Sequence, residues 1–299
     1  MSENTNYILS CESTVDMPFS YVSKRDIPVL FYSYTVDSKE YLDDMERDPK
    51  ALSRFYGFIA NGKLPSTSQI NTFKYEEYFE SLLKQGKDIL HIAFGSGMTP
   101  SVNNALEAAQ ALNEKYSGQT ITVLDSYCSS SGYGLLVDMA ADLRDSGKSL
   151  KEVADFVKNI RRKINHEFFT TDLKYFKRSG RVSGPAATLA SVLGLCPTMR
   201  LNYDGKIVAY GKVRGKKNAI AHVIDVMKQH AKDGENFSGK CFISHADCIN
   251  DAELLKLEIE KALPKAKGNI RIFNIGTIIA SHCGPGTVAA YFVGDERPE

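Results

Sequence analysis

Short apolar runs alternate with amphipathic, helix-like segments along almost the whole chain. The strand-like runs cover residues 7–10, 29–34, 89–94, 120–124, 168–170, 206–210, 241–244, 270–275 and 289–293. Helical periodicity covers residues 75–84, 101–114, 134–146, 150–164, 184–193, 219–229 and 252–263. Strands that alternate with helices at this spacing form βαβ units, which build parallel sheets. The sequence therefore predicts an α/β fold with largely parallel sheets.

The clearest βαβ unit is a strand at 89–94, a helix at 101–114 and a strand at 120–124. In such units the loops that follow the strands gather at one edge of the sheet, where ligands bind. We therefore expect functional residues in the strand-end loops at 11–16, 95–100, 125–132 and 281–286.

The length of 299 residues suggests two domains. A linker-like stretch at 161–167 follows two charged helices, and glycine-rich turns at 178–184 and 203–205 come after it. We expect two α/β domains, residues 1–165 and 166–299, with a mainly parallel sheet in the first.

Charge and composition narrow the classes of function. The formal net charge is +1, whereas nucleic-acid-binding proteins are usually clearly basic. No apolar run approaches the roughly 18 residues of a membrane span, and the polar start lacks the basic region of a signal peptide. The six cysteines form no CxxC pair, so we expect no metal or dithiol site. These features predict a cytoplasmic protein with no nucleic-acid partner and no stable membrane insertion.

Hydroxyl and amide side chains cluster in two loops. Residues 65–69 read Pro-Ser-Thr-Ser-Gln before a helical pattern, where hydroxyls and free N–H groups can bind a carboxylate or phosphate. Residues 95–101 read Gly-Ser-Gly-Met-Thr-Pro-Ser after a strand, which places Ser96 at the sheet edge. The alternatives are a plain N-cap and a tight βα turn. Pro100 excludes a dinucleotide fingerprint, and the GxSxG of a nucleophile elbow is missing.

Other candidate residues carry positive charge or can acquire it. His282 precedes a rigid Gly-Pro-Gly turn that can aim its imidazole at an anion, although a lone histidine is more often structural. Arg178 and Arg181 lie in a glycine-bounded loop, where one can pair with a carboxylate or both can remain solvated. The turn at 212–217, Lys-Val-Arg-Gly-Lys-Lys, is either a solvated turn or a docking patch for an acidic partner. Together these groups suit binding of an anionic ligand end better than hydrolysis or redox chemistry.

In their order along the chain, the motifs closely resemble the DegV family. They are Glu-Ser-Thr-Val-Asp-Met-Pro at 12–18, Thr-Ser-Gln at 67–69, Ser-Gly-Met-Thr at 96–99, Asp-Ser at 125–126, Gly-Arg-Val at 180–182, the basic turn at 212–217 and His-Cys-Gly-Pro-Gly at 282–286. The resemblance covers nearly the whole chain. Family members are similar to fatty-acid-binding proteins that present an acyl chain to a separate fatty acid kinase.

The resemblance implies a non-catalytic carrier for phospholipid synthesis, with one long-chain fatty acid between two α/β domains and no cofactor. It implies that Thr67, Ser96 and His282 contact the carboxylate of the fatty acid. It also places Arg181 near the pocket, and it assigns Arg214, Lys216 and Lys217 to a surface that faces the kinase.

The chain departs from the family pattern at several positions. Glu12 and Gly95 stand where members often have Asp and Ser, and Ile70 stands where Pro is common. Thr-Pro-Ser at 99–101 replaces Ser-Gly-Thr. The key hydroxyls remain, so we expect binding to persist, with an altered preference among acyl chains.

Two alternatives belong to other classes of protein. A serine hydrolase acting on acyl esters would use Ser96, Asp125 and His282, which follow the chain order of α/β-hydrolases. A regulatory scaffold would bind no lipid. The carrier is physically coherent because burial stabilises a bound chain by about 0.8 kcal/mol per methylene, while the carboxylate needs hydrogen bonds.

Overall fold

The computed structural model describes residues 7–183 and 194–299, which form three sheets. The first sheet has the order β2-β1-β6-β7, and its strands pair in parallel. Its strands are β1 (Tyr7–Glu12), β2 (Val29–Leu30), β6 (Asp88–Ala93) and β7 (Ile121–Asp125). The parallel sheet predicted for the N-terminal half is confirmed.

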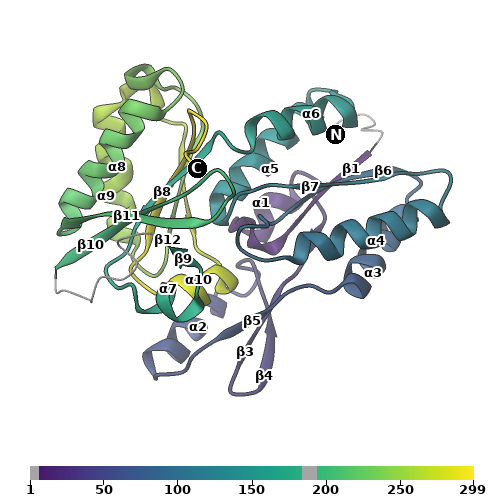
Figure 1. Ribbon diagram of the computed structural model, residues 1–299, viewed down its shortest axis with the longest axis horizontal. Helices are drawn as coiled ribbons and strands as arrows, with labels where there is room; N and C mark the ends of the chain where they lie inside the picture. Colours follow the sequence, from purple (N-terminus) through teal and green to yellow (C-terminus); the bar gives the residue numbers. More distant parts are fainter. Residues whose placement is uncertain (1–6, 184–193) are drawn as a thin grey trace.

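Helices cover both faces of this sheet. Figure 1 shows α5 and α6 on one face and α3 and α4 on the other, which explains why β1 and β6 are buried almost throughout. The short α1 and the 3₁₀ turn η1 follow β1. These elements are η1 (Ser13–Val15), α1 (Phe19–Ser23), α3 (Thr72–Leu83), α4 (Ser101–Lys115), α5 (Ser130–Asp145) and α6 (Leu150–Ile160).

The second sheet is mixed and has the order β13-β12-β14-β8-β10-β11-β9. Helices α8 and α9 pack against it around a core of their own, and α5 contacts β8, β12 and β14. Helix α5 therefore packs against both large sheets. The elements are β8 (Ile164–Phe169), β9 (Val182–Ser183), β10 (Leu195–Leu201), β11 (Ile207–Arg214), α8 (Lys216–His230), η3 (Gly234–Asn236), β12 (Cys241–His245), α9 (Ile249–Ala262), η4 (Pro264–Ala266), β13 (Ile270–Asn274) and β14 (Val288–Val293).

The linker predicted at 161–167 is wrong in its second part, because residues 164–167 belong to the buried strand β8. The polar side chains that suggested a linker have partners inside the protein. His166 Nδ1 lies 2.9 Å from the Ile164 carbonyl oxygen, and Glu167 accepts a hydrogen bond of 2.6 Å from the Tyr210 hydroxyl. These polar side chains can be buried in the strand because their polar groups have hydrogen-bond partners.

A small third sheet, β4-β3-β5, joins the two halves. Helix α10 comes from the C-terminal end of the chain but contacts β3 and β5, and it also packs against α7. Two segments that we expected to be loops are partly regular structure: residues 65–69 contain β5, and residues 281–286 contain the end of α10. The elements are β3 (Ser33–Val36), β4 (Lys39–Leu42), α2 (Ala51–Ala60), β5 (Ser66–Ser68), α7 (Lys174–Ser179) and α10 (Thr277–Cys283).

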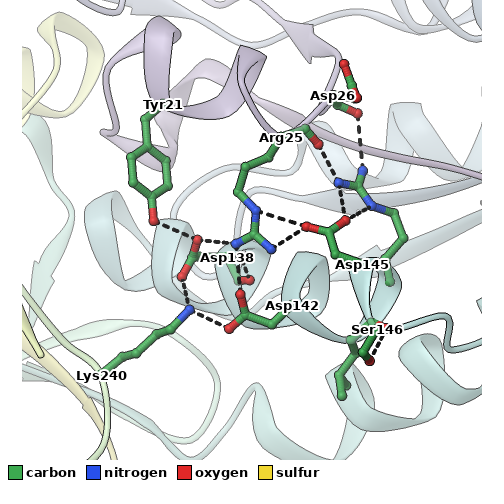
Figure 2. A network of polar contacts seen from close by, with 10 residues as sticks. Tyr21, Arg25, Asp26, Asp138, Asp142, Asp145, Ser146 and Lys240 are labelled. Atoms are coloured by element: carbon green, nitrogen blue, oxygen red, sulfur yellow. Dashed lines mark hydrogen bonds and ion pairs between the residues drawn. The ribbon is translucent and has the colours of Figure 1, made fainter. Parts of the chain in front are cut away.

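Charged side chains tie α5 to its neighbours on either side (Figure 2). Asp138 of α5 accepts hydrogen bonds from Arg25 at 2.6 Å, from the Tyr21 hydroxyl at 2.8 Å and from Lys240 at 2.5 Å. Arg25 follows α1, whereas Lys240 directly precedes β12. The network therefore links the first sheet's helices to the second sheet.

Some expectations lie beyond these observations. The domain division between residues 165 and 166 stays a prediction, and the helix predicted at 184–193 lies outside the described residues. Within residues 7–183 and 194–299, no helix is both long and apolar enough to cross a membrane. The six cysteines are unpaired.

Candidate functional site

A cavity of about 500 Å³ opens between the two halves of the chain, a size typical of ligand pockets. Its walls are mainly apolar, with hydroxyl, imidazole and guanidinium groups at some positions. The N-terminal half contributes Tyr32, Thr67, Ser68, Gln69, Phe94, Met98, Thr99, Pro100 and Ser129. The C-terminal half contributes Phe176, Arg181, Ile207, Ile278, Ile279, His282 and Cys283.

A second, smaller cavity of about 40 Å³ adjoins the first and shares walls with it, among them Phe176, Ile207 and Ile279. It reaches Phe168 and Tyr291 on the second sheet. The two cavities together favour a mostly apolar ligand.

Two predicted site residues meet in the larger cavity. Thr67 Oγ1 lies 2.8 Å from His282 Nε2, although the residues are 215 positions apart. Strand β5 holds Thr67 opposite Tyr34 of β3, and His282 is in the last turn of α10. The contact between α10 and the small sheet therefore creates this pair.

The imidazole of His282 is neutral at pH 7. Burial, together with the nearby positive charges of Arg181 and Arg178, lowers the pKa of His282 to about 4. Its Nδ1 atom is buried and has no protein partner. A neutral imidazole carries one N–H, so the Thr67–His282 pair can donate to a ligand oxygen from either the hydroxyl or the ring.

Two arginines border this pair. Arg178 Nη2 donates to the carbonyl oxygens of Ser281, at 2.9 Å, and Pro65, at 3.3 Å. Arg178 thereby ties the start of β5 to α10. Arg181 lines the cavity, remains exposed and donates to the Ser179 carbonyl.

Ser96 does not line the cavity that Thr67 and His282 share. Ser96 is exposed and absent from the cavity walls, and its backbone N–H donates to Asp125 Oδ1 at 3.1 Å. Three residues later, Thr99 does line the cavity. Thr99 is missing from the residues predicted above; the signal that identifies it is a hydroxyl just before the start of α4.

The hydrolase alternative finds no support in this geometry. His282 Nε2 is paired with Thr67, and Asp125 Oδ1 accepts backbone N–H groups from Ser96 and Tyr127. A triad needs the base to contact the nucleophile and a third group to orient the base. Ser96, Asp125 and His282 therefore do not form one.

The basic turn lies outside the cavity walls. Arg214 ends β11, and Lys216 and Lys217 begin α8; all three are exposed. Lys216 pairs with Asp251 at 2.6 Å. Positive charges at a helix N-terminus oppose the helix dipole, so this placement is not explained by helix stability.

The described part of the chain contains no group of three or more His, Cys, Asp or Glu residues arranged to hold a metal ion. The polar groups on the cavity wall are instead neutral donors and an arginine, beside apolar side chains. Such an arrangement can bind a small anionic group that carries an apolar tail.

Comparison with known proteins gives consistent results. The family model described as "Uncharacterised protein, DegV family" matches residues 9–295. A DegV domain-containing protein of Clostridium perfringens is 35% identical over 293 residues, which are 97% of this chain and 98% of that protein.

Two solved structures share the fold. A fatty acid binding DegV family protein of Streptococcus agalactiae superimposes with a TM-score of 0.81 at 25% identity, over 98% of this chain and 100% of that one. A stearic acid-binding protein of Eubacterium ventriosum superimposes with a TM-score of 0.84 at 20% identity, over 96% of this chain and 98% of that one.

Proposed function

This chain belongs to the DegV family, and from that premise we propose that it binds one long-chain fatty acid in the cavity between its two halves. The acyl chain occupies the larger cavity and the smaller one that adjoins it. The carboxylate lies beside Thr67 and His282.

The observation that carries this proposal is the Thr67–His282 pair on the wall of a mainly apolar cavity. A carboxylate buried without partners is strongly disfavoured, and this pair supplies donors without a metal. Each buried methylene adds about 0.8 kcal/mol of favourable transfer free energy, so the tail provides most of the affinity. The fatty acid and stearic acid named for the two solved structures support the same ligand class.

Two further polar side chains on the cavity wall can contribute to the proposed head-group site. Arg181 lines the cavity and can pair with the carboxylate. Thr99 is a further hydroxyl on the cavity wall. Ser96, implied by the resemblance, would have to turn inward from its exposed position to reach the ligand.

Binding is tested with delipidated protein and a fluorescent long-chain fatty acid. The wild type should bind one equivalent, and native mass spectrometry of the protein as purified should show a bound fatty acid mass. Thr67→Val should weaken binding about tenfold or more, because a hydrogen bond to a charged group contributes about 1.5–3 kcal/mol.

Thr122→Val is the matched control, since Thr122 lies on β7 outside the cavity walls. Equal affinities for the two valine variants would refute the head-group assignment. Absence of binding by the wild type would refute the proposed function.

We further propose that the protein works in the cytoplasm as a carrier that presents the carboxylate to a fatty acid kinase. The unpaired cysteines agree with a reducing compartment. Arg214, Lys216 and Lys217 form the proposed docking surface, which is exposed and separate from the cavity walls.

The docking proposal is tested by charge reversal. Arg214→Glu with Lys217→Glu should reduce phosphorylation of the bound lipid by a purified fatty acid kinase at least tenfold, while lipid loading stays normal. Lys84→Glu, an exposed change at the end of α3, is the control. Normal phosphorylation by the double variant would exclude this surface.

A further inference from the structure

The side chain of Arg178 bridges the two segments that carry the Thr67–His282 pair. Its Nη2 atom donates to the carbonyl oxygen of Ser281, at 2.9 Å, and to that of Pro65, at 3.3 Å. Ser281 directly precedes His282 along the chain. Pro65 lies two positions before Thr67. One guanidinium nitrogen therefore joins the main chain beside each member of the pair.

The sequence leaves the Ser281 carbonyl available for this contact. In an α-helix each carbonyl accepts from the N–H four residues later, but the residue four positions after Ser281 is Pro285, which has no N–H. Ser281 also lies near the end of α10, where carbonyl groups lack helical partners and positive charges are favoured. The guanidinium of Arg178 thus supplies a donor that α10 itself does not provide.

Strand β5 needs this support because little of it is buried. It has three residues, and Ser66 and Ser68 on either side of Thr67 are exposed. It lies at the edge of the small sheet, where it pairs with β3. A short and exposed edge strand opens locally at a low cost in free energy. A second attachment beside Thr67 therefore limits how far its hydroxyl can move from His282.

Arg178 is exposed, yet its surroundings limit its motion. The guanidinium carbon lies 5.6 Å from the centre of the Tyr175 ring. Tyr175 is buried, and an added Cβ at Gly284 would clash with its ring, so α7 packs tightly against the end of α10. An arginine that stacks on a fixed ring loses less side-chain freedom when it binds two carbonyl oxygens.

Arg178 differs from Arg181 in its relation to the cavity, because Arg181 lines the cavity and Arg178 does not. We propose that Arg178 is a positioning residue for the head-group pair. It holds the main chain beside Thr67 and beside His282, so that the two side chains stay in contact, and it does not bind the fatty acid itself. This inference rests on the proposed function and adds a residue that controls the affinity from outside the cavity.

A double-mutant cycle tests the inference with a fluorescent long-chain fatty acid at pH 7. The proteins are the wild type, Arg178→Met, Thr67→Val and the double variant. Arg178→Met should weaken binding about three- to tenfold, the effect expected for lost hydrogen bonds. In the Thr67→Val background the same change should weaken binding less than about twofold, because the pair that Arg178 holds is already broken.

Lys174→Met is the matched control for the loss of one positive charge. Lys174 is exposed on the same helix, pairs with Asp172 at 3.1 Å and lies outside the cavity walls. This variant should bind within about twofold of the wild type. Wild-type affinity in Arg178→Met, or equal losses in Arg178→Met and Lys174→Met, would overturn the inference. An equal loss from Arg178→Met with and without the Thr67 hydroxyl would indicate direct contact with the ligand and would overturn it as well.

A second measurement follows the pair without ligand. At pH 7 the ring of His282 is neutral, with Nε2 beside the Thr67 hydroxyl and Nδ1 without a protein partner, so the two nitrogens are unequal. Their nitrogen NMR shifts should move toward each other in Arg178→Met, as in Thr67→Val, and should keep the wild-type values in Lys174→Met. Unchanged shifts in Arg178→Met would contradict the inference. Failure of the wild type to bind the probe would refute the proposed function, and the ring shifts would still decide whether Arg178 holds the pair.

Discussion

Thr99 and Ser96 share one loop but have different surroundings. Thr99 lines the cavity and its hydroxyl lies 3.2 Å from that of Ser101, whereas Ser96 is exposed. We predict that Thr99→Val weakens fatty acid binding about tenfold, within the effect expected for a hydrogen bond to a charged group. Ser96→Ala should change the affinity less than twofold. Isothermal titration calorimetry measures the affinity of each variant. A larger loss of affinity in Ser96→Ala than in Thr99→Val would indicate that Ser96 contacts the ligand.

The pKa of His282 gives a second test at the scale of a single residue. Because burial and two arginines lower its pKa to about 4, we predict that NMR titration of its ring gives a midpoint near that value. Arg181→Gln should move the midpoint upward, toward the unperturbed 6.5 of the same residue. A lowered pKa means that the neutral ring stabilises the folded state above pH 6.5 and that this stabilisation is lost as the pH falls toward 4. A midpoint near 6.5 in the wild type would contradict the buried position.

At the scale of elements, α5 approaches the second sheet too closely for side chains at some positions. A Cβ at Gly132 would lie 2.3 Å from His166 Nε2 and 2.6 Å from the Tyr291 ring. We predict that Gly132→Ala lowers the free energy of unfolding by about 1–3 kcal/mol through overpacking. Gly118→Ala, with open space around its Cβ, should change it by less than about 0.5 kcal/mol. Urea unfolding measures the free energy of unfolding of both variants, and equal losses would contradict the close packing of α5 against the second sheet.

The sequence predicts best the elements with long, regular patterns. The unit at 89–124 corresponds to β6, α4 and β7, because its strands are buried apolar runs and its helix is long enough to show periodicity. By contrast, β5 is Ser-Thr-Ser and is held by pairing to β3, which no local pattern reveals. Strand β10 contains Pro197, which argues against a strand in sequence, and α10 has only seven residues.

The sequence likewise predicts only part of the candidate site. Thr67 and His282 can be identified as candidates from their motifs, but their contact depends on α10 crossing to the small sheet. The burial of Asp43 has no sequence signal, since it follows a short, mostly exposed strand and resembles many turn aspartates. Long-range packing of this kind is set by the whole core rather than by neighbouring residues.

At the scale of the whole molecule, the network around Asp138 joins the halves (Figure 2). Asp138 is 1% exposed and pairs with both Arg25 and Lys240. We predict that Asp138→Ala lowers the free energy of unfolding by about 3 kcal/mol, because two cations lose a buried partner. Asp142→Ala, at a half-exposed position in the same network, should lower it by less than about 1 kcal/mol. Similar losses from the two variants in urea unfolding would show that burial of Asp138 is unimportant.

A ligand in the cavity touches both halves, so we also predict a strong effect of the ligand on stability. At a free concentration of one hundred times Kd, binding should add about 2.7 kcal/mol to the free energy of unfolding. Thermal unfolding with and without a long-chain fatty acid measures this gain. Thr67→Val should show a smaller gain at the same ligand concentration, and no shift for the wild type would argue against a ligand in this cavity.

The walls of the cavity come from both halves of the chain, so whatever fills it completes the interior of the protein. If the ligand stabilises the folded state as predicted, a molecule without it opens more often and is then exposed to proteases, since degradation follows the population of the open form. Supply of the ligand would therefore set how long each molecule survives as well as how many are filled. A cell starved of the ligand would lose the protein itself, and the amount of the protein would become a record of recent supply.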